Sequence, residues 1–294
     1  MSSQRNVLDK LFSAERQLPT LPVIFTELNE MIRNPFVSSR RIADLVMKDQ
    51  SLVSRVLKLS NSAFYAKRQE IKDLANAVTF LGSDVLRNLV LQLSLVKLFP
   101  RLDPQIPDFK LSTFWEHSLA AAYFSNILAA KLKLPVDESY YVSGLLHDMG
   151  KLALCHFHPE LFSQAVMRQI ELGETDYRAE AAVVGVDHAE IGAFLAEKWK
   201  FRPETIKAIR EHHRDSFSGT DLHAPLVRIA NFFSKAAGFN FPWDAGSIDI
   251  IGDQAWAVLS ARSKQKLDVE RITFEIYEES DKVRDLVNTL LSLA

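Results

Sequence analysis

The chain is organised around one stretch, Gly144-Leu145-Leu146-His147-Asp148-Met149-Gly150-Lys151-Leu152, which places three polar side chains inside an apolar run. Histidine and aspartate can both ligate a metal, and lysine can hold an anion. In a helix, His147, Asp148 and Lys151 share one face because residues three and four apart are neighbours. An exposed face with a solvated Asp–Lys pair has the same pattern, so the remainder of the chain has to decide between a site and a surface.

Length and composition are those of an ordinary globular protein. The 294 residues, 47% hydrophobic and 24% charged, suffice for one large domain or two of ordinary size. A single cysteine, Cys155, excludes an internal disulfide framework and fits a reducing compartment. Met1 to Lys10 has no apolar signal core, and the most apolar window, Val85 to Leu98, is too short and too polar to span a bilayer. We therefore expect a cytoplasmic protein without a membrane segment.

Charge is distributed unevenly, although the net charge is only −2. Residues 1–110 carry 16 Lys and Arg against 11 Asp and Glu, whereas the remainder carries 19 against 26. This asymmetry predicts two halves with different surfaces. The best linker candidate is Leu102 to Asp108, which contains two prolines and divides the chain into predicted domains 1–108 and 109–294.

The N-terminal half is predicted to consist of short helices joined by tight turns. Pro22 suits the first turn of a helix that runs to about Arg33, and Asn34-Pro35 ends it. Polar N-caps then open three further helices: Ser38 or Ser39, Asp49 and Asp73. Gly82 ends the last of these, and a helix follows that is so apolar from Val85 to Leu98 that we expect it to be buried nearly all round.

The piece from Ile42 to Asn61 also permits a helix-turn-helix interpretation. Its second helix offers a polar stripe such as a groove-reading helix would present: Ser51, Arg55, Lys58 and Ser62. A helical pair whose polar stripe faces water explains the same pattern, and strong basic clustering is missing. We therefore do not expect nucleic acid as the partner.

The second half begins with a long helix that a capping box predicts at Thr113 to Glu116. This helix carries His117, and its small residues Ala120 to Ala122 allow another helix to approach closely. His156 and His158 lie further along the chain. We expect them to be loop residues near the site rather than ligands.

Three later helices each carry polar residues of interest: His188 in the first turn of a helix capped by Asp187, His212-His213 at the end of a helix that starts at Pro203, and Asn231 within a helix from about Pro225 to Ala237. An irregular loop is predicted for 239–252, and helices are predicted for 255–261, 269–278 and 281–293. The last helix contains the apolar segment Val287 to Leu293, which is either a packing helix or a dimer contact.

Five histidines and one aspartate thus lie on four predicted helices: His117, His147, Asp148, His188, His212 and His213. Imidazole nitrogen and carboxylate oxygen together suit a divalent ion such as Fe, Mn, Ni or Zn. The adjacent His147–Asp148 pair can reach one ion from both sides or bridge two ions. His212 and His213 diverge by roughly 100° on a helix, so they would serve different ions, or one ion and its substrate.

In this order the ligands resemble those of the HD superfamily of metal-dependent phosphohydrolases, and Leu145 to Lys151 is the most specific piece. Four N-terminal segments are similar to the HDOD domain, an HD-related output module of bacterial signalling proteins: Leu18-Pro19-Thr20-Leu21-Pro22, Asp49-Gln50-Ser51-Leu52, Lys58-Leu59-Ser60-Asn61-Ser62-Ala63 and Ala77-Val78-Thr79-Phe80-Leu81-Gly82. The resemblance covers about residues 15 to 235. It implies an all-α fold, in which a multi-helical HD-like bundle is preceded by a smaller helical N-terminal subdomain.

Two departures from the family pattern bear on activity. Catalytic HD enzymes complete the metal site with an aspartate in the last helix, and the matching residue here is Asn231. Its uncharged amide would hold a metal less tightly than a carboxylate. The stretch Arg214 to Ser218 lacks the motif of the HD-GYP branch, so hydrolysis of cyclic di-GMP is not expected.

Two functions remain open at this point. The first is a signalling output module with a degenerate metal site, which binds a partner protein or a nucleotide messenger. The second is a metal-dependent phosphohydrolase acting on a nucleotide or phosphodiester, with the metal activating a water. Asp148 and Lys151 would then be catalytic, Lys151 would neutralise phosphate charge, and His212 or His213 would hold a second ion or the substrate. The metal itself would be held by four residues: His117, His147, Asp148 and His188.

Overall fold

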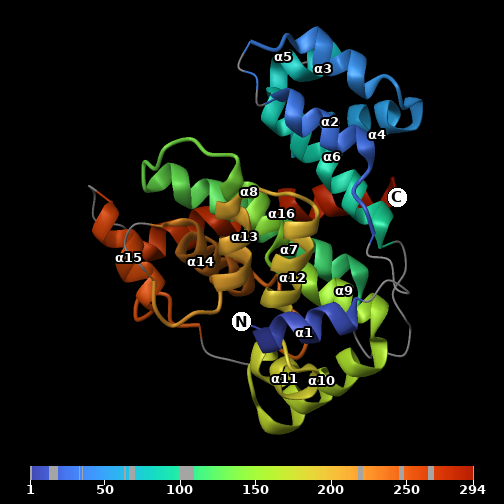
Figure 1. Cartoon of the computed structure of the whole chain (residues 1–294). Coiled ribbons are helices and arrows are strands. Elements are labelled where there is room, and N and C mark those ends of the chain that lie inside the picture. The colour runs from blue at the N-terminus through green and yellow to red at the C-terminus, as the bar shows by residue number, and fades with distance from the viewer. Residues whose placement is uncertain are drawn as a thin grey trace. The chain divides into compact units, whose positions relative to one another are not determined.

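A computed structural model describes residues 2–12, 19–32, 34, 36–62, 64–65, 70–99, 109–217, 221–244, 248–263 and 268–293. The regular secondary structure of these residues is helical, and no strand occurs among them (Figure 1). The predicted all-α class is therefore confirmed. Within the same residues, no helix combines the length and the apolar character that a membrane crossing requires.

The helices divide into two compact units. The large unit consists of Met1–Leu18 and Arg101–Ser280, and the small unit consists of Pro19–Pro100 and Asp281–Ala294. This division differs from the predicted domains 1–108 and 109–294, because the first helix belongs with the second half of the chain and the last residues belong with the first. The predicted linker, Leu102 to Asp108, lies outside the described residues.

The first helix, α1 (Ser2–Leu11), is held in the large unit by polar and aromatic contacts. Arg5 Nη1 lies 3.0 Å from Glu197 Oε2. The Phe12 ring stacks on that of Phe194 with 6.0 Å between the centroids. These contacts explain why the start of the chain belongs with residues almost two hundred positions away.

The small unit contains α2 (Val23–Ile32), α3 (Ser39–Val46), α4 (Gln50–Ser60), α5 (Leu74–Leu81), α6 (Ser83–Leu98) and the end of α16 (Val269–Ser292). Three predicted N-caps are confirmed, because the side chains of Ser38, Asp49 and Asp73 each accept a backbone N–H at the helix start. Helix α6 is buried over most of its length, as its apolar sequence predicts. Val287 and Leu290 are fully buried, which favours a packing role for the C-terminal segment.

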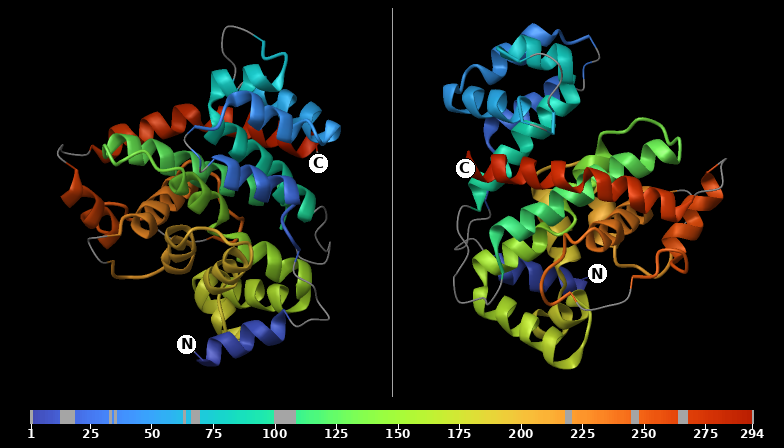
Figure 2. Two further views of the ribbon diagram at one scale, coloured as in Figure 1. Left: turned by 45° about the horizontal axis from the view of Figure 1, so that its top comes forward. Right: turned by 180° about the vertical axis from the view of Figure 1, so that it is seen from behind.

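The large unit contains α7 (Leu111–Lys131), α8 (Ser139–Leu146), α9 (Met149–Phe157), α10 (Pro159–Leu172), α11 (Asp176–Val184), α12 (His188–Lys198), α13 (Pro203–Glu211), α14 (His223–Ala236), α15 (Gln254–Arg262) and the beginning of α16. Helix α7 packs against α8 and α14, whereas α9 packs against α10 and α12. Helices α10 and α11 lie side by side (Figure 2).

Some predicted details of the large unit are wrong. Helix α7 begins two residues before the capping box at Thr113, and no side chain caps it. His156 lies within α9 rather than in a loop. Helix α16 is continuous where two helices were predicted, because Glu279 and Ser280 between them are compatible with helix.

The stretch around His147 forms two helices rather than one. Helix α8 ends at Leu146 and α9 begins at Met149, so His147 and Asp148 occupy a tight turn between them. Every residue from Ser139 to Cys155 is buried. The interpretation as an exposed helix face is therefore excluded.

Two glycines allow this turn to lie against its neighbours. A Cβ added at Gly144 would lie 2.7 Å from the carbonyl oxygen of Ala121 on α7, and one added at Gly150 would lie 2.0 Å from the carbonyl oxygen of His188 on α12. Only a residue without a side chain permits such close backbone approaches. The close approach predicted at Ala120 to Ala122 is thus confirmed, and the glycines bring two ligand-bearing helices to the His147–Asp148 turn.

Candidate metal centre

Six predicted ligands lie together in the interior of the large unit. They come from α7, from the α8–α9 turn, from the first residue of α12 and from the turn after α13. Their ligand atoms form two groups, each within 4.8 Å: His117, His147 and Asp148, and Asp148, His188, His212 and His213. Asp148 belongs to both groups.

The Asp148 carboxylate lies between two sets of imidazoles. Its Oδ1 is 3.1 Å from His188 Nε2 and 3.7 Å from His212 Nε2. Its Oδ2 is 3.4 Å from His117 Nε2, which in turn is 3.2 Å from His147 Nε2. One carboxylate therefore connects ligands from every element of the site.

His212 and His213 join the same group, whereas helical geometry predicted that they would diverge. Both lie in the turn that follows α13, and their ring centroids are 3.9 Å apart. His213 Nε2 lies 2.8 Å from His188 Nε2, and the ring of Tyr177 stacks on that of His213 at 4.5 Å between the centroids. The end of the helix at Glu211 thus removes the angular separation on which the prediction depended.

Hydrogen bonds fix the orientation of the imidazoles. Nδ1 of His117 lies 2.6 Å from the Phe239 carbonyl, Nδ1 of His147 lies 2.8 Å from the Gly144 carbonyl, and Nδ1 of His212 lies 2.7 Å from the Ile209 carbonyl. A carbonyl oxygen only accepts, so Nδ1 carries the proton in each case. In the neutral rings the lone pair is then on Nε2, which faces Asp148, and this is the arrangement that metal-ligating histidines adopt.

The spacing of these atoms fits a metal ion. Ligand bonds of about 2.1 Å at right-angled to tetrahedral geometry place neighbouring donors about 3.0 to 3.4 Å apart. The distances of 3.1 to 3.4 Å among Asp148, His188, His117 and His147 fall in this range. Asp148 Oδ1 and His212 Nε2 are buried without a hydrogen-bond partner among the described residues. Buried polar atoms of this kind require a partner, and a divalent cation between them supplies one.

Burial and charge separate the protonation states of the histidines. Burial lowers the pKa of His147 to about 3, and burial also lowers the pKa of His212 and His213 well below the usual value. These three rings are therefore neutral at pH 7. Burial opposes protonation of His188 too, but the Glu180 and Asp148 carboxylates outweigh it and raise the pKa of His188 to about 10. A metal at His188 Nε2 has to displace that proton.

Lys151 is engaged by two carboxylates in the interior. Its Nζ lies 2.9 Å from Asp148 Oδ2 and 2.6 Å from Asp176 Oδ2. Burial acts against the ammonium charge, yet the two carboxylates hold the pKa of Lys151 well above its usual value. A phosphate would have to compete with Asp176 for this lysine, so its predicted catalytic role stays a prediction.

Helix α11 supplies two residues that the sequence reasoning missed. Glu180 Oε2 accepts the His188 backbone N–H at 2.7 Å and lies 2.6 Å from His188 Nδ1. Asp176 binds Lys151, as described above. The two carboxylates are four residues apart on one helix face, which was detectable, but nothing in the sequence connects that face with His188.

Asn231 is buried on α14, a helix that packs against α7 and α8. Its Oδ1 has no hydrogen-bond partner among the described residues. This free acceptor is compatible with coordination through the amide oxygen, which stays a prediction. His158 is occupied elsewhere, because its Nε2 lies 2.9 Å from the Leu11 carbonyl.

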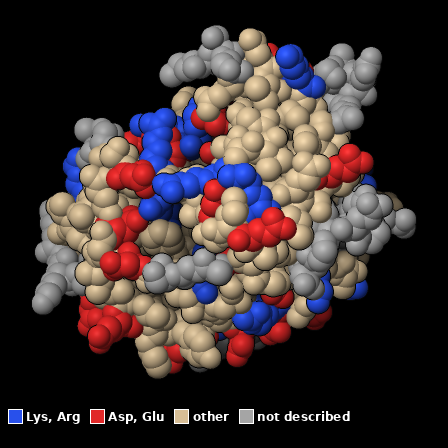
Figure 3. All heavy atoms as spheres, turned by 90° about the horizontal axis from the view of Figure 1, so that it is seen from below, with Lys and Arg blue, Asp and Glu red and all other residues tan. Residues whose placement is uncertain are grey.

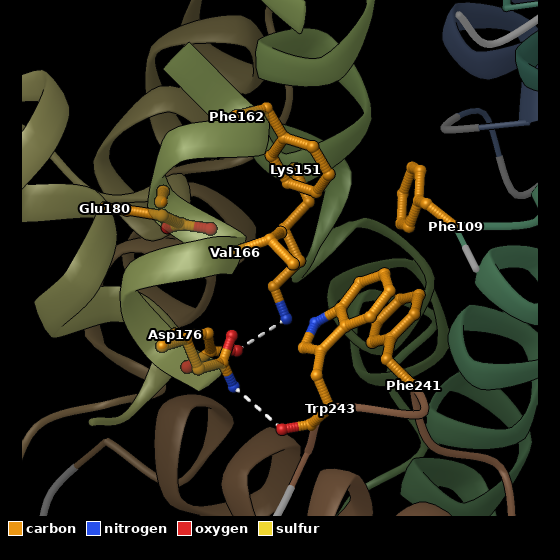
Figure 4. A pocket seen from close by; sticks show the side chains of 10 residues that line it. Phe109, Lys151, Phe162, Val166, Asp176, Glu180, Phe241 and Trp243 are labelled. Atoms are coloured by element: carbon orange, nitrogen blue, oxygen red, sulfur yellow. Dashed lines mark hydrogen bonds and ion pairs between the residues drawn. The ribbon is translucent and has the colours of Figure 1, made fainter. Parts of the chain in front are cut away.

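A small cavity of about 10 Å³, with room for about one water molecule, adjoins the centre on the side of Lys151 (Figure 4). Gln169 and Asp176 provide polar groups to its wall. Aromatic rings form much of the remainder, and they belong to Phe109, Phe162, Phe241 and Trp243. The Phe241 and Trp243 rings are stacked with 5.7 Å between the centroids. The wall of the cavity beside the candidate metal ligands is therefore largely apolar.

The molecular surface in Figure 3 has Lys and Arg side chains interleaved with Asp and Glu. Binding to a phosphate backbone relies on clustered positive charge. The mixed charge on this face therefore adds no support for a nucleic-acid partner.

Comparison with known sequences gives one family and several relatives. The HDOD domain matches residues 18–215. An uncharacterized protein of Treponema pallidum is 30% identical over 226 residues, which are 76% of this chain and 42% of the relative. Ribonuclease Y of Geotalea uraniireducens is 33% identical over 122 residues, which are 42% of this chain and 18% of the relative. The chain thus spans less than half of the length of either relative.

Solved structures share the fold over almost the whole chain. An HDOD domain protein of unknown function from Geobacter sulfurreducens has a TM-score of 0.85 and 26% identity, and the match covers 98% of each chain. A candidate phosphohydrolase from Shewanella amazonensis has a TM-score of 0.74 and 24% identity, with 97% of each chain covered. A candidate signal transduction protein from Marinobacter aquaeolei has a TM-score of 0.79 and 21% identity, covering 98% of this chain and 66% of that one. The last two matches establish the fold alone.

Proposed function

This chain belongs to the HDOD domain family, and we propose that it is a signal-transduction output module that acts by binding a partner protein or a nucleotide messenger. Its metal centre would then be a structural or regulatory element of the large unit. The relative named as a candidate signal transduction protein agrees with this assignment.

The observation that carries the proposal is the closed state of the centre. His117, His147, Asp148 and His188 each have 0% exposed surface and His212 has 1%, whereas His213 is partly buried. A catalytic metal keeps a coordination position open to substrate, whereas a structural metal is enclosed by protein ligands. Lys151, the lysine predicted to bind a phosphate group, is already bound by two carboxylates. The resting centre is therefore better suited to holding an ion than to turning over a substrate.

The ligand set provides for one or two divalent ions, with Fe, Mn, Ni and Zn as the candidates. His117 and His147 would hold one ion together with Asp148. His188, His212 and His213 would hold another together with the same carboxylate, and Asn231 is the further candidate ligand. The two-group arrangement predicts that replacing Asp148 removes all bound metal, whereas replacing His117 leaves part of it.

The small unit offers a place for a partner to bind. An open groove there is lined by Ser54, Lys58, Asn61 and Lys72, among others. Asn61 holds its shape, because the side-chain amide exchanges two hydrogen bonds with the Ile71 backbone at 2.9 and 2.8 Å. We expect Lys58→Glu and Lys72→Glu to abolish capture of the partner and to leave metal content unchanged.

Metal-dependent phosphohydrolysis is the second candidate function, and the clustered histidines with their shared carboxylate favour it. A bound divalent ion would supply Lewis acidity and activation of water for a nucleotide or phosphodiester substrate. His117, His147, Asp148 and His188 would position that ion, and Lys151 would bind phosphate oxygen if it left Asp176. The sequence similarity to Ribonuclease Y over 122 residues supports this alternative.

One experiment separates the two functions. Protein reconstituted with each metal is incubated with a panel of nucleotides and phosphodiesters, and both thermal shift and product formation are followed. The binding function predicts a ligand-dependent thermal shift without product. Product that disappears in Asp148→Ala would overturn it in favour of hydrolysis. Absence of metal after reconstitution would overturn the metal centre in both functions.

A further inference from the structure

The segment 238–244, which follows α14, contacts the metal centre and lines the adjoining cavity. Its residues alternate between the two sides: Phe239 and Phe241 are buried, whereas Asn240 and Pro242 are exposed. The segment therefore has one buried face and one exposed face, with turns at 237–238 and 242–243.

The inward face of the segment contacts two residues of the centre. The Phe239 carbonyl accepts the Nδ1 proton of His117 at 2.6 Å. The Phe241 ring centroid lies 5.7 Å from that of the His117 ring and 5.1 Å from Lys151 Nζ. The same segment therefore orients a metal ligand and covers the lysine beside it.

Local turns and contacts with other elements hold the segment in place. The backbone N–H groups of Gly238 and Phe239 donate to the carbonyls of Lys235 and Ser234, and the Asp244 N–H donates to the Phe241 carbonyl. Asp244 pairs with Lys235 at 3.0 Å, and the Trp243 carbonyl accepts a weak bond from Gln169 Nε2 at 3.4 Å (Figure 4). These backbone bonds are those of local turns, whereas the helices around the segment have continuous i to i−4 hydrogen bonds. Segments with few backbone hydrogen bonds open at lower free energy than helices do.

We propose that segment 238–244 is the movable cover of the metal centre and of the adjoining cavity, and that its closure is coupled to metal binding through the His117–Phe239 contact. Phe241 and Trp243 form the part of the cavity wall that leaves when the cover opens. The remaining walls belong to helices, including Phe162 on α10, and to Phe109 just before α7. The proposal rests on the metal centre of the proposed function, whether that centre regulates binding or hydrolyses a substrate.

The coupling follows from the chemistry of imidazole. A cation at His117 Nε2 withdraws electron density from the ring and strengthens the bond from Nδ1–H to the Phe239 carbonyl. The cover is therefore held more firmly when the metal is bound. By reciprocity, loosening the cover weakens the hold on the metal.

The test measures release of Zn²⁺ from the reconstituted full chain into excess chelator. Phe241→Ala removes the ring that holds the cover down, and we expect release to accelerate about tenfold, as loss of one aromatic contact implies. The matched control is Phe162→Ala, which removes a ring from the same cavity but from a helix, and its release rate should stay within about twofold of the parent. Equal acceleration of Zn²⁺ release by both variants, or no acceleration by Phe241→Ala, would refute the proposal that the segment is a movable cover.

A milder variant and a second measurement protect the test against loss of folding. Lys235→Met removes the ion pair with Asp244 at the end of the segment, and it should also accelerate Zn²⁺ release. Amide hydrogen exchange of the metal-free chain should be faster at 239–243 than in α7 and α9, and Zn²⁺ should slow it. If the amides of 239–243 exchange as slowly as those of the helices, the proposal of a movable cover is refuted, whether or not metal binds. If they exchange fast but no metal binds, the cover stands, and only its coupling to metal and the metal centre itself are rejected.

Discussion

Replacing Gly150 by alanine is the sharpest test of how the centre is assembled. The added Cβ would lie 2.0 Å from the His188 carbonyl oxygen and 2.8 Å from the Gly192 backbone nitrogen. Both obstacles belong to the backbone of α12, so no side-chain rotation relieves them. Helix α9 has to move away from α12 by about 1 Å or more before the contact becomes tolerable.

The expected cost has two parts. Overpacking in a close-packed interior costs about 1 to 3 kcal/mol, and a clash with backbone belongs at the upper end. For a unit of this size that corresponds to a loss of about 6 to 12 °C in melting temperature. The same movement carries Asp148 away from His188. Asp148 Oδ1 and His188 Nε2 are only 3.1 Å apart in the structure. Because site geometry has to be held within about 0.5 Å, metal affinity should fall at least about 100-fold.

The assay combines thermal unfolding with metal content and chelator competition. Gly173→Ala is the matched control. The backbone at Gly173 has a positive φ of +63°, which favours glycine, but the space around an added Cβ is open. It should cost about 1 kcal/mol through backbone strain while leaving metal affinity unchanged. A Gly150→Ala protein with the parent's melting temperature and metal content would refute the close α9–α12 contact as the basis of the site.

Three further predictions concern the residues around the ligands. Glu180→Gln keeps the shape but removes the charge beside His188, so metal affinity should fall about 10- to 100-fold in chelator competition without change in circular dichroism; unchanged affinity would contradict the positioning role. Lys151→Met leaves the Asp148 and Asp176 carboxylates buried without their cation, so denaturant unfolding of the metal-free protein should show a loss of about 3 to 5 kcal/mol. Saturating metal should recover part of this loss by neutralising Asp148, and equal losses with and without metal would contradict that. Finally, the pKa of His188 is raised from 6.5 to about 10, so its ion pair stabilises the metal-free fold fully below pH 6.5 and less as pH rises through about 10. Over the same range metal affinity should rise, because a proton leaves the ligand, and an affinity that falls between pH 6.5 and 10 would refute the assignment.

Local rules predicted the helix starts well where the cap is a property of a few adjacent residues. Asp49, Asp73 and Asp187 each accept a backbone N–H three residues ahead, as their sequence context indicates. The same rules failed at Thr113, because the helix gains stability by starting earlier and the cap contributes only about 1 kcal/mol. Tertiary packing can override a term of that size.

The candidate ligands could be selected from their order along the chain, but the groups that orient them could not. Glu180 lies eight residues before His188 on a different helix, and the Phe239 carbonyl lies 122 positions from His117. A backbone carbonyl has no sequence signal, since every residue carries one. The role of Gly150 was equally hidden, because a close helix approach is a distance between two elements and not a pattern in either of them.

The opening rate of the cover can distinguish the two candidate functions, because the centre is closed by protein. An enzyme must open its site in every catalytic cycle, so turnover cannot exceed the opening rate of segment 238–244. A binding module has to open only when its ion or ligand exchanges, and slow opening then does no harm. Amide exchange of Phe239 to Trp243 in the metal-loaded protein gives this opening rate directly when the open state exchanges faster than it closes. An opening rate of about once per hour would exclude an ordinary enzyme, whose turnover is about 1 to 1000 per second. Opening on the millisecond scale would remove the main physical objection to hydrolysis, and the closed geometry at His147 and Asp148 would then be one state of an enzyme.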